Sequence, residues 1–271
     1  MCLLQRTFYV ASLAILVFSA AADEPEVDAA RARHLQRMRE LAGSIRVVAD
    51  PANAKVAVKL QEEPILRYSD STRKTHESSL WTWTDGGRPT AILAVEYYAD
   101  HPKGPQWLYE IASLSTELIA AQREENFDWS AKEGGVHFKT FPEAPLPADK
   151  AARRLAQMKE LRNRFTAFED ASFSGRVELR HLVTPLMRYS KQDEGLIDGA
   201  VFALANGTNP EVLIVLEAQM EKQKLAWHYA LVHMSGEPAN VQLDGEEIWQ
   251  RDGDAPPAVR TSYINGWMPA Q

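Results

Sequence analysis

Apolar side chains recur at helical spacing in two stretches of the chain. The first stretch places five of them on one face: Leu35, Met38, Leu41, Ala42 and Ile45. The second stretch, 151–164, contains neither glycine nor proline. It carries a similar stripe that ends just after it: Leu155, Met158, Leu161 and Phe165. Arginine and glutamate occupy many of the remaining positions. This pattern predicts two amphipathic helices, each of which covers apolar surface with one face.

Most other apolar residues lie in short runs separated by turn residues, which predicts β-strands. The predicted strands of the first half are 46–48, 56–60, 80–83, 91–98 and 107–114, and those of the second half are 165–168, 177–182, 201–204, 212–216 and 227–234. Glycine-containing turns at 84–89 and 206–210 predict tight hairpins. Every residue of 212–216 is apolar, so we expect both faces of that strand to be covered.

The two halves carry the same phrases at a constant spacing. The segment Pro-x-x-Arg-Tyr-Ser at 64–69 returns at 185–190, which is 121 positions later (185 − 64). Other residues return 120 or 121 positions later: Glu96 as Glu217, Trp107 as Trp227 and Tyr109 as Tyr229. A period of about 120 residues is too long for a solenoid repeat and has the size of a small domain. The sequence therefore predicts a tandem duplication.

The predicted fold is α+β, with two homologous repeats that each contain a helix followed by about five or six antiparallel strands. The segments 64–69 and 185–190 are expected to form edge strands, because proline cannot donate a hydrogen bond to a neighbouring strand. The strand at 212–216 needs a cover on each face. Its own helix can cover one face and the neighbouring repeat the other, so we expect the repeats to pack as a pseudo-dimer.

These elements divide the chain into five segments: a signal peptide at 1–22, repeat 1 at 23–125, a Pro-rich linker at 126–150, repeat 2 at 151–251, and a loose C-terminal tail at 252–271. Residues 1–22 carry one charge, Arg6, an apolar run at 8–18, and small residues that fit cleavage after Ala22. The run is too short to span a membrane. We expect an exported, periplasmic or extracellular protein with no membrane span after signal removal; a retained anchor is the alternative.

Composition excludes several classes of function. The single cysteine, Cys2, lies in the predicted signal, so the mature chain has no disulfide, thiolate metal site or cysteine nucleophile. The formal net charge is −7 and no basic stripe is present, which argues against nucleic acid as a partner. The chain shows no H-E-x-x-H motif, phosphate loop, dinucleotide fingerprint or nucleophile elbow. We therefore expect no metal and no cofactor.

Some polar residues stand at the same place in both halves. Arg67, Tyr68, Arg188 and Tyr189 are candidates for a binding surface in the cleft between the repeats.

Glu96 and Glu217 each end an apolar strand run, where an unpaired carboxylate would be costly. Two structural explanations, a pair with an arginine in each repeat or a glutamate that emerges at a strand end, are favoured over a proton-sharing dyad formed by the two glutamates across the cleft.

Trp81 and Trp83 could form a stacking platform for a ligand. In the second half, however, Phe202 and Leu204 hold the corresponding positions. Exchange of this kind is what a core face tolerates, so we expect the two indoles to pack in the core.

The repeated phrases also carry a resemblance. They include Gly-Arg-Pro at 87–89 before an apolar strand ending in Glu96, Gly-Thr-Asn-Pro-Glu-Val-Leu at 207–213, and Trp129-Ser130 before the Pro-rich segment. Together they resemble uncharacterised exported proteins of planctomycete bacteria over about residues 31–250. The resemblance implies lineage and secretion, and it implies no activity or catalytic residue.

Three functions remain open from the sequence. The first is a non-catalytic binding or interaction protein of the cell envelope or periplasm, with an unknown envelope ligand or protein as partner. The alternative is a hydrolase with acid/base residues in the cleft between the repeats; groups found in one half only would then cluster: His76, Glu110, His228 and His233. The third is a structural or assembly role.

Overall fold

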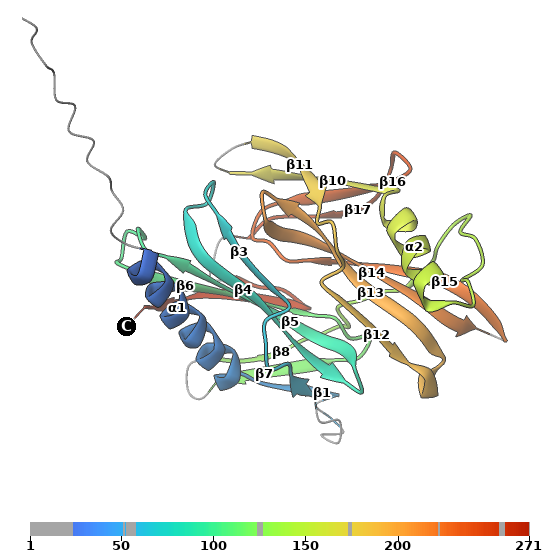
Figure 1. Cartoon of the computed structure of the whole chain (residues 1–271), viewed down its shortest axis with the longest axis horizontal. Helices are drawn as coiled ribbons and strands as arrows, with labels where there is room; N and C mark the ends of the chain where they lie inside the picture. The colour runs from blue at the N-terminus through green and yellow to red at the C-terminus, as the bar shows by residue number, and fades with distance from the viewer. Residues whose placement is uncertain are drawn as a thin grey trace, which may run out of the picture.

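A computed structural model describes residues 24–50, 52, 58–123, 127–172, 175–221, 223–254 and 258–270. The protein is mostly antiparallel sheet with two α-helices in these residues, as the α+β prediction requires. Strongly curled sheets fill most of the molecule, and the helices lie on their outer sides (Figure 1). The predicted signal peptide and part of the predicted strand at 56–60 lie outside the described residues. No helix in the described ranges is long and apolar enough to cross a membrane.

The first half of the chain begins with a helix and continues as strands. Its elements are α1 (Glu24–Ser44), β1 (Arg46–Ala49), β2 (Lys59–Leu60), β3 (Leu66–Asp70), β4 (Thr75–Asp85), β5 (Arg88–Tyr98), β6 (Gln106–Ser113), β7 (Ile119–Arg123) and β8 (Phe127–Ser130).

The second half also has a helix followed by strands, after a short strand. Its elements are β9 (Lys139–Thr140), α2 (Ala151–Arg162), β10 (Phe165–Ala171), β11 (Gly175–His181), β12 (Met187–Lys191), the 3₁₀ turn η1 (Gln192–Glu194), β13 (Leu196–Asn206), β14 (Asn209–Glu221), β15 (Lys224–His233), β16 (Ala239–Leu243), β17 (Glu246–Arg251), β18 (Ala258–Val259) and β19 (Tyr263–Pro269).

The described strands form three antiparallel sheets. The first sheet has the order β18-β19-β6-β5-β4-β2, with β3 also paired to β4. The second sheet has the order β17-β16-β10-β11-β13-β14-β15-β9, with β12 also paired to β13. The small sheet is β1-β7-β8. As predicted for the two Pro-x-x-Arg-Tyr-Ser segments, β3 and β12 each pair on one side in these sheets.

The predicted hairpins are confirmed. Gly86 and Gly87 join β4 to β5 with φ of 56° and 96°, values that favour glycine. Gly207, with φ of 60°, begins the turn between β13 and β14. These two hairpins supply the long central strands of both sheets.

The C-terminal segment differs from its prediction as a loose tail. From Tyr263 to Pro269, β19 pairs with β6, so the chain returns from the second sheet and extends the first sheet. The linker is also partly ordered as sheet, since β8 pairs with β7 and β9 pairs with β15. The sequence contains an apolar run in this tail, Tyr263-Ile264, but no indication of which edge it would extend.

Three apolar cores follow from strands that are buried on both faces. On β14, Val212, Ile214 and Leu216 pack in one core that also holds Met158 and Leu161 of α2. The helix therefore covers one face of the strand, as predicted. A corresponding core under α1 holds Trp81 and Trp83, which confirms that these indoles pack inside the protein.

The third core, called the central core below, is shared by both sheets. It takes Leu80, Ile92 and Ala94 from the first sheet. It takes Val201, Leu213 and Val215 from the second sheet. Strand alternation thus sends odd and even residues of β5 and β14 into different cores, and both faces of β14 are covered.

A close approach on β13 leads to a prediction about stability. A Cβ on Gly199 would lie 2.7 Å from the ring of Tyr189. Gly199→Ala should therefore destabilise the protein by about 1–3 kcal/mol, because the ring must move in a packed core. Gly43→Ala in α1 is the control, because nothing lies within 4 Å of a Cβ there. Chemical denaturation measures both; equal stabilities for the two variants would contradict the prediction.

Candidate ligand-binding cavity

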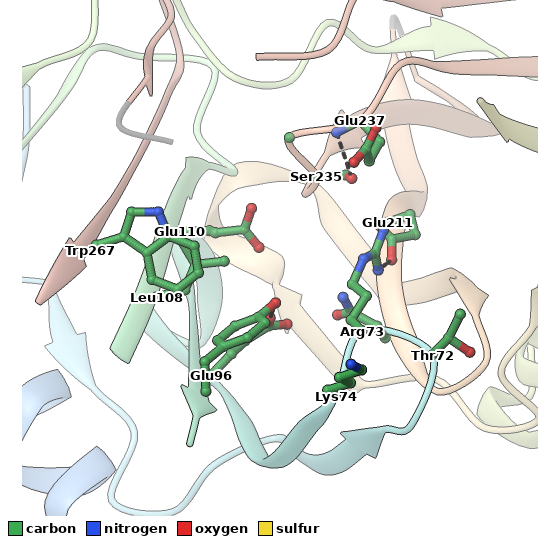
Figure 2. A pocket seen from close by; sticks show the side chains of 13 residues that line it. Thr72, Arg73, Lys74, Glu96, Leu108, Glu110, Glu211, Ser235, Glu237 and Trp267 are labelled. Atoms are coloured by element: carbon green, nitrogen blue, oxygen red, sulfur yellow. Dashed lines mark hydrogen bonds and ion pairs between the residues drawn. The ribbon is translucent and has the colours of Figure 1, made fainter. Parts of the chain in front are cut away.

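A cavity of about 380 Å³ opens at one end of the central core. Its walls come from β5, β6 and β19 of the first sheet, the loop between β3 and β4, the start of β14, and the loop after β15. Figure 2 shows the acidic side chains of Glu96, Glu110 and Glu211 around this space, with Trp267 on one side and Arg73 on the other. Alternation along the strands puts these acids on the same faces as the central core.

Glu96 is held firmly within the cavity wall. Its side chain is 1% exposed. Tyr68 donates a hydrogen bond of 2.8 Å to Oε1, and Tyr98 donates one of 2.8 Å to Oε2. Burial raises the pKa of Glu96, and the nearby Asp70 adds to this, whereas Arg73 and the two tyrosines oppose it. Both oxygens are thus occupied by hydroxyl groups.

Glu110 lies beside Glu96 on the neighbouring strand. Glu110 faces Ala94 across the β5–β6 pairing and Glu96 faces Leu108, so the two carboxyls are diagonal neighbours on one face. Burial, with help from the nearby Glu96 charge, raises the pKa of Glu110 to about 8 against the opposing effects of Tyr263 and Arg73. Glu110 therefore carries a proton at neutral pH.

Arg73 connects the first half to two acids of the second half. It donates a hydrogen bond to Glu211 of β14 and one of 2.8 Å to Glu169 of β10. Asn206 and Ser235 also donate to Glu169, each at 2.9 Å. Charge-assisted bonds of this kind are strong where water is excluded. The loop between β3 and β4 is thereby fixed against the second sheet.

Glu211 is buried beside Arg73. Burial raises the pKa of Glu211 well above the usual range, and the Glu169 carboxyl adds to this, against the effect of Arg73. Its Oε1 accepts a hydrogen bond from Arg73, and its Oε2 is buried with no hydrogen-bond partner among the described residues. Burial without enough positive charge therefore disfavours the ionised form of Glu211.

The opposite wall of the cavity is apolar and aromatic. Trp267 of β19 meets Tyr98 edge-on, with ring centroids 5.0 Å apart, and Leu108 lies beside them. Trp267 also packs against His101 at 4.7 Å. An aromatic wall facing polar groups is typical of small-ligand sites. This wall exists because the C-terminal strand returns to the first sheet.

None of the four predicted binding residues lines this cavity; Tyr68 contacts it indirectly, through its hydrogen bond to Glu96. Tyr189 lies elsewhere and donates a 2.8 Å hydrogen bond to Glu217. Arg67 and Arg188 point to the other side of their strands, where Arg67 pairs with Glu77 at 3.3 Å and Arg188 with Asp198. A binding role for these residues stays a prediction, and the structure does not gather them in one cleft.

The two predicted carboxylates are held apart, and their arginine partners differ from those expected. Glu217 accepts a 2.8 Å hydrogen bond from Arg88 of the first half, and Gln219 also donates to it. Glu96 and Glu217 thus have separate partners at separate places, and the structure does not form a dyad from them. Each glutamate pairs with a tyrosine rather than with Arg67 or Arg188 because side chains alternate along a strand. Within β3 and within β12, the arginine and the tyrosine that follows it face opposite sides.

The residues found in one half only do not form a cluster. Glu110 and His233 both lie near Arg260, which contacts His233 Nδ1 at 2.6 Å. Burial, with help from Arg260, lowers the pKa of His233 to about 3. His228 lies 3.5 Å from Glu221, and His76 lies in a surface hollow beside Arg67. The four residues therefore share no single site, and the hydrolase stays a prediction without this set of residues to support it.

The sequence did not indicate three residues that line the cavity, Arg73, Glu211 and Trp267, or two that bond to lining residues, Glu169 and Tyr263. Glu211 directly precedes the apolar run 212–216, which could have marked it as a buried acid. Arg73 sits in a turn and gives no such indication. Within the described residues, no group of three or more His, Cys, Asp or Glu side chains could hold a metal ion.

Comparison with protein-family models, with curated proteins and with solved structures gave no significant match. The cavity and its charges therefore carry the functional argument.

The pKa of Glu110 leads to a prediction about stability and pH. The pKa of Glu110 is about 8 in the folded protein, whereas the ordinary pKa of glutamate is 4.5. The contribution of protonated Glu110 to folding stability is fully present below pH 4.5. It is lost as pH rises towards 8, by up to about 1.4 kcal/mol per pH unit. Glu110→Gln should remove this loss, so the variant gains on the wild type between pH 5 and 8. Urea denaturation at several pH values measures the difference.

Glu246→Gln is the matched control, since Glu246 is an exposed acid on β17. It should follow the wild-type pH profile. If Glu110→Gln followed that profile as well, Glu110 would titrate as an ordinary surface acid and the prediction would be wrong.

Proposed function

We propose that the protein is an exported, non-catalytic binding protein of the cell envelope or periplasm, and that the cavity between its two main sheets is its ligand site. The observation that carries this proposal is the cavity itself. Its volume of about 380 Å³ lies in the range of small-molecule sites, and an aromatic wall faces several fixed polar groups. The aromatic wall lies on strands, and the facing loop is fixed by the bonds of Arg73 to Glu211 and Glu169, so little ordering is needed on binding.

The proposal includes a tandem duplication in which the repeats pack as a pseudo-dimer. Its support is the repeated local geometry: Tyr68 donates to Glu96 and Tyr189 donates to Glu217, each at 2.8 Å and from equivalent strands. The central core shared by the two sheets adds to this support. Export is part of the proposal through the segment 1–22, as is kinship with exported planctomycete proteins.

The two ends of such a pseudo-dimer differ in charge. At the end near Glu217, Arg88 and Lys191 supply cations, and Lys191 pairs with Asp85 at 2.7 Å. The other end, which contains Glu96, has two further buried acids, Glu110 and Glu211. Divergence after duplication would have specialised one end for a ligand, and the acidic end holds the aromatic wall.

A hydrolase is the second candidate, and one observation favours it. Glu110 carries a proton at neutral pH and faces the same side of the sheet as Glu96 on the adjacent strand. A protonated carboxyl beside a second carboxyl is the arrangement used for general acid catalysis. Under this alternative Glu110 would protonate a leaving group, and the pair differs from the histidine-containing set that the sequence suggested.

A thermal-shift screen tests the binding function. The panel holds envelope glycans, peptidoglycan fragments, organic amines and neutral alcohols. A ligand present at about 100 times its dissociation constant should stabilise the folded protein by about 2.7 kcal/mol. Trp267→Ala removes the aromatic wall and should abolish that shift.

Trp249→Ala is the control variant, because Trp249 is another partly buried indole, on β17 and outside this cavity. It should keep the ligand-induced shift. A shift that persists in Trp267→Ala would place the ligand elsewhere and refute the site. If the wild type hydrolysed the ligand and Glu110→Gln did not, the protein would be a hydrolase rather than a binding protein.

A further inference from the structure

Acidic groups outnumber cationic groups around the cavity. Five buried carboxyls surround this end of the central core: Asp70, Glu96, Glu110, Glu169 and Glu211. The cations that act on them from nearby are Arg73 and Arg260. Arg260 is also paired with Asp254, so only part of its charge acts on this group. Lys74 lines the cavity as an exposed side chain, where water screens its charge.

Protons compensate for part of this imbalance in the ligand-free protein. Burial without enough positive charge disfavours the ionised forms of Glu110 and Glu211 and raises the pKa of both, so Glu110 holds a proton at neutral pH. Glu211 already has a cationic partner, because Arg73 donates a hydrogen bond to its Oε1. Glu110 accepts its hydrogen bond from the neutral Tyr263 hydroxyl instead, so Glu110 is the acid to consider for a ligand.

One oxygen of Glu110 remains for a ligand. Tyr263 donates to Oε1, and in the described part of the chain no hydrogen bond to Oε2 is found. The side chain is 4% exposed, yet its carboxyl lines the cavity. Figure 2 shows that carboxyl in the space between Trp267 and Arg73. A nearly buried carboxyl oxygen thus projects into an open volume, with no hydrogen-bond partner among the described residues.

The groups that face Glu110 are fixed by their own contacts. They are Tyr68 on β3, Arg73 after β3, Glu96 and Tyr98 on β5, Arg260 after β18, and Tyr263 on β19. Tyr98 and Tyr68 are engaged with Glu96, and Asn265 donates to the Tyr263 hydroxyl at 3.1 Å. No rearrangement of these residues is required for a donor to approach Oε2 from the cavity.

We propose that the ligand of this cavity is a small organic cation, a primary amine or guanidine on an apolar or aromatic skeleton, whose charged group binds Glu110 and whose skeleton lies against Trp267 and Tyr98. The proposal rests on the proposed binding function and names its ligand class. A cation supplies the charge that the carboxyls lack, and aromatic faces attract cations in addition to apolar groups. An anionic ligand would meet like charge on most of the wall.

Binding should release a proton from Glu110 to the buffer. The ammonium or guanidinium favours the ionised carboxylate, so the proton leaves as the ion pair forms. Below the pKa of Glu110, the affinity for a cation should then rise by up to about tenfold per pH unit, and it should level off above that pKa. A neutral ligand would show neither the proton release nor this rise.

Isothermal titration calorimetry with benzylamine and agmatine, each in two buffers of different ionisation enthalpy, tests this proposal. Benzyl alcohol is the neutral match for benzylamine. We expect the amines to bind with release of a substantial fraction of one proton at pH 7, and benzyl alcohol to bind at least about tenfold more weakly, because a hydrogen bond to a charged group is lost. Glu110→Gln should weaken amine binding by at least about tenfold and abolish the proton release.

Glu217→Gln is the matched control: Glu217 is equally buried and accepts the same type of tyrosine hydrogen bond, but it does not line the cavity. It should bind the amines as the wild type does. Equal binding of benzylamine and benzyl alcohol, or unchanged amine binding by Glu110→Gln, would overturn the cation assignment, as would the absence of heat from both amines at millimolar concentration.

The outcome also separates this proposal from the binding function beneath it. If a neutral glycan or alcohol bound and Trp267→Ala abolished that binding, the cavity would remain the ligand site and the cation assignment would fall. If amines bound equally well to wild type and Trp267→Ala, both the site and the ligand class would be wrong.

Discussion

The structure depends on the burial of both faces of its central strands. Residues of β5 and β14 alternate between a core under the helix of their own half and the central core shared by the two sheets. At about 25 cal/mol per Å² of apolar surface, this double burial is the dominant favourable contribution to folding. It also requires the two sheets to meet, because neither inner face could remain in water. Everything polar at the ends of the central core must then be paired.

The two ends meet that requirement in different ways. At one end Arg88 crosses from the first half to Glu217. At the other end Arg73 crosses to Glu211 and Glu169, and more acids are present than this one guanidinium can balance. An unbalanced buried charge is costly, so protons remain on carboxyls that would otherwise ionise. The cavity beside those carboxyls is where a ligand's charge would have the largest effect, since water there is restricted.

The sequence predicted what depends on local pattern. Helical spacing placed Met38 and Met158 in cores, glycine turns defined the hairpins, and the apolar run at 212–216 required two covers. The exchange of Trp81 for Phe202 in the other half correctly favoured a core position over a ligand platform. Each of these inferences needs only the period of a helix or strand and the cost of exposed apolar surface.

The site was harder to predict because its residues meet through tertiary contacts. Alternation sends Arg67 outward when Tyr68 points inward, so the retained arginine could not pair with Glu96. The cation that does act there, Arg73, comes from a turn and reaches residues 138 and 96 positions away on two strands. The C-terminal strand carries Trp267 to the cavity through a sheet edge that no local pattern specified.

The central claim is that Glu110 stays neutral in a cavity between two sheets because burial and Glu96 disfavour its charge. A carbon-13 NMR titration of the glutamate side-chain carboxyls, with Glu110→Gln used to assign the resonance, tests this most directly. The account predicts a Glu110 carboxyl that titrates near pH 8, far above the exposed glutamates. A Glu110 carboxyl that titrates near 4.5 would contradict it, since the cavity would then hold an ordinary solvated carboxylate with no proton to release.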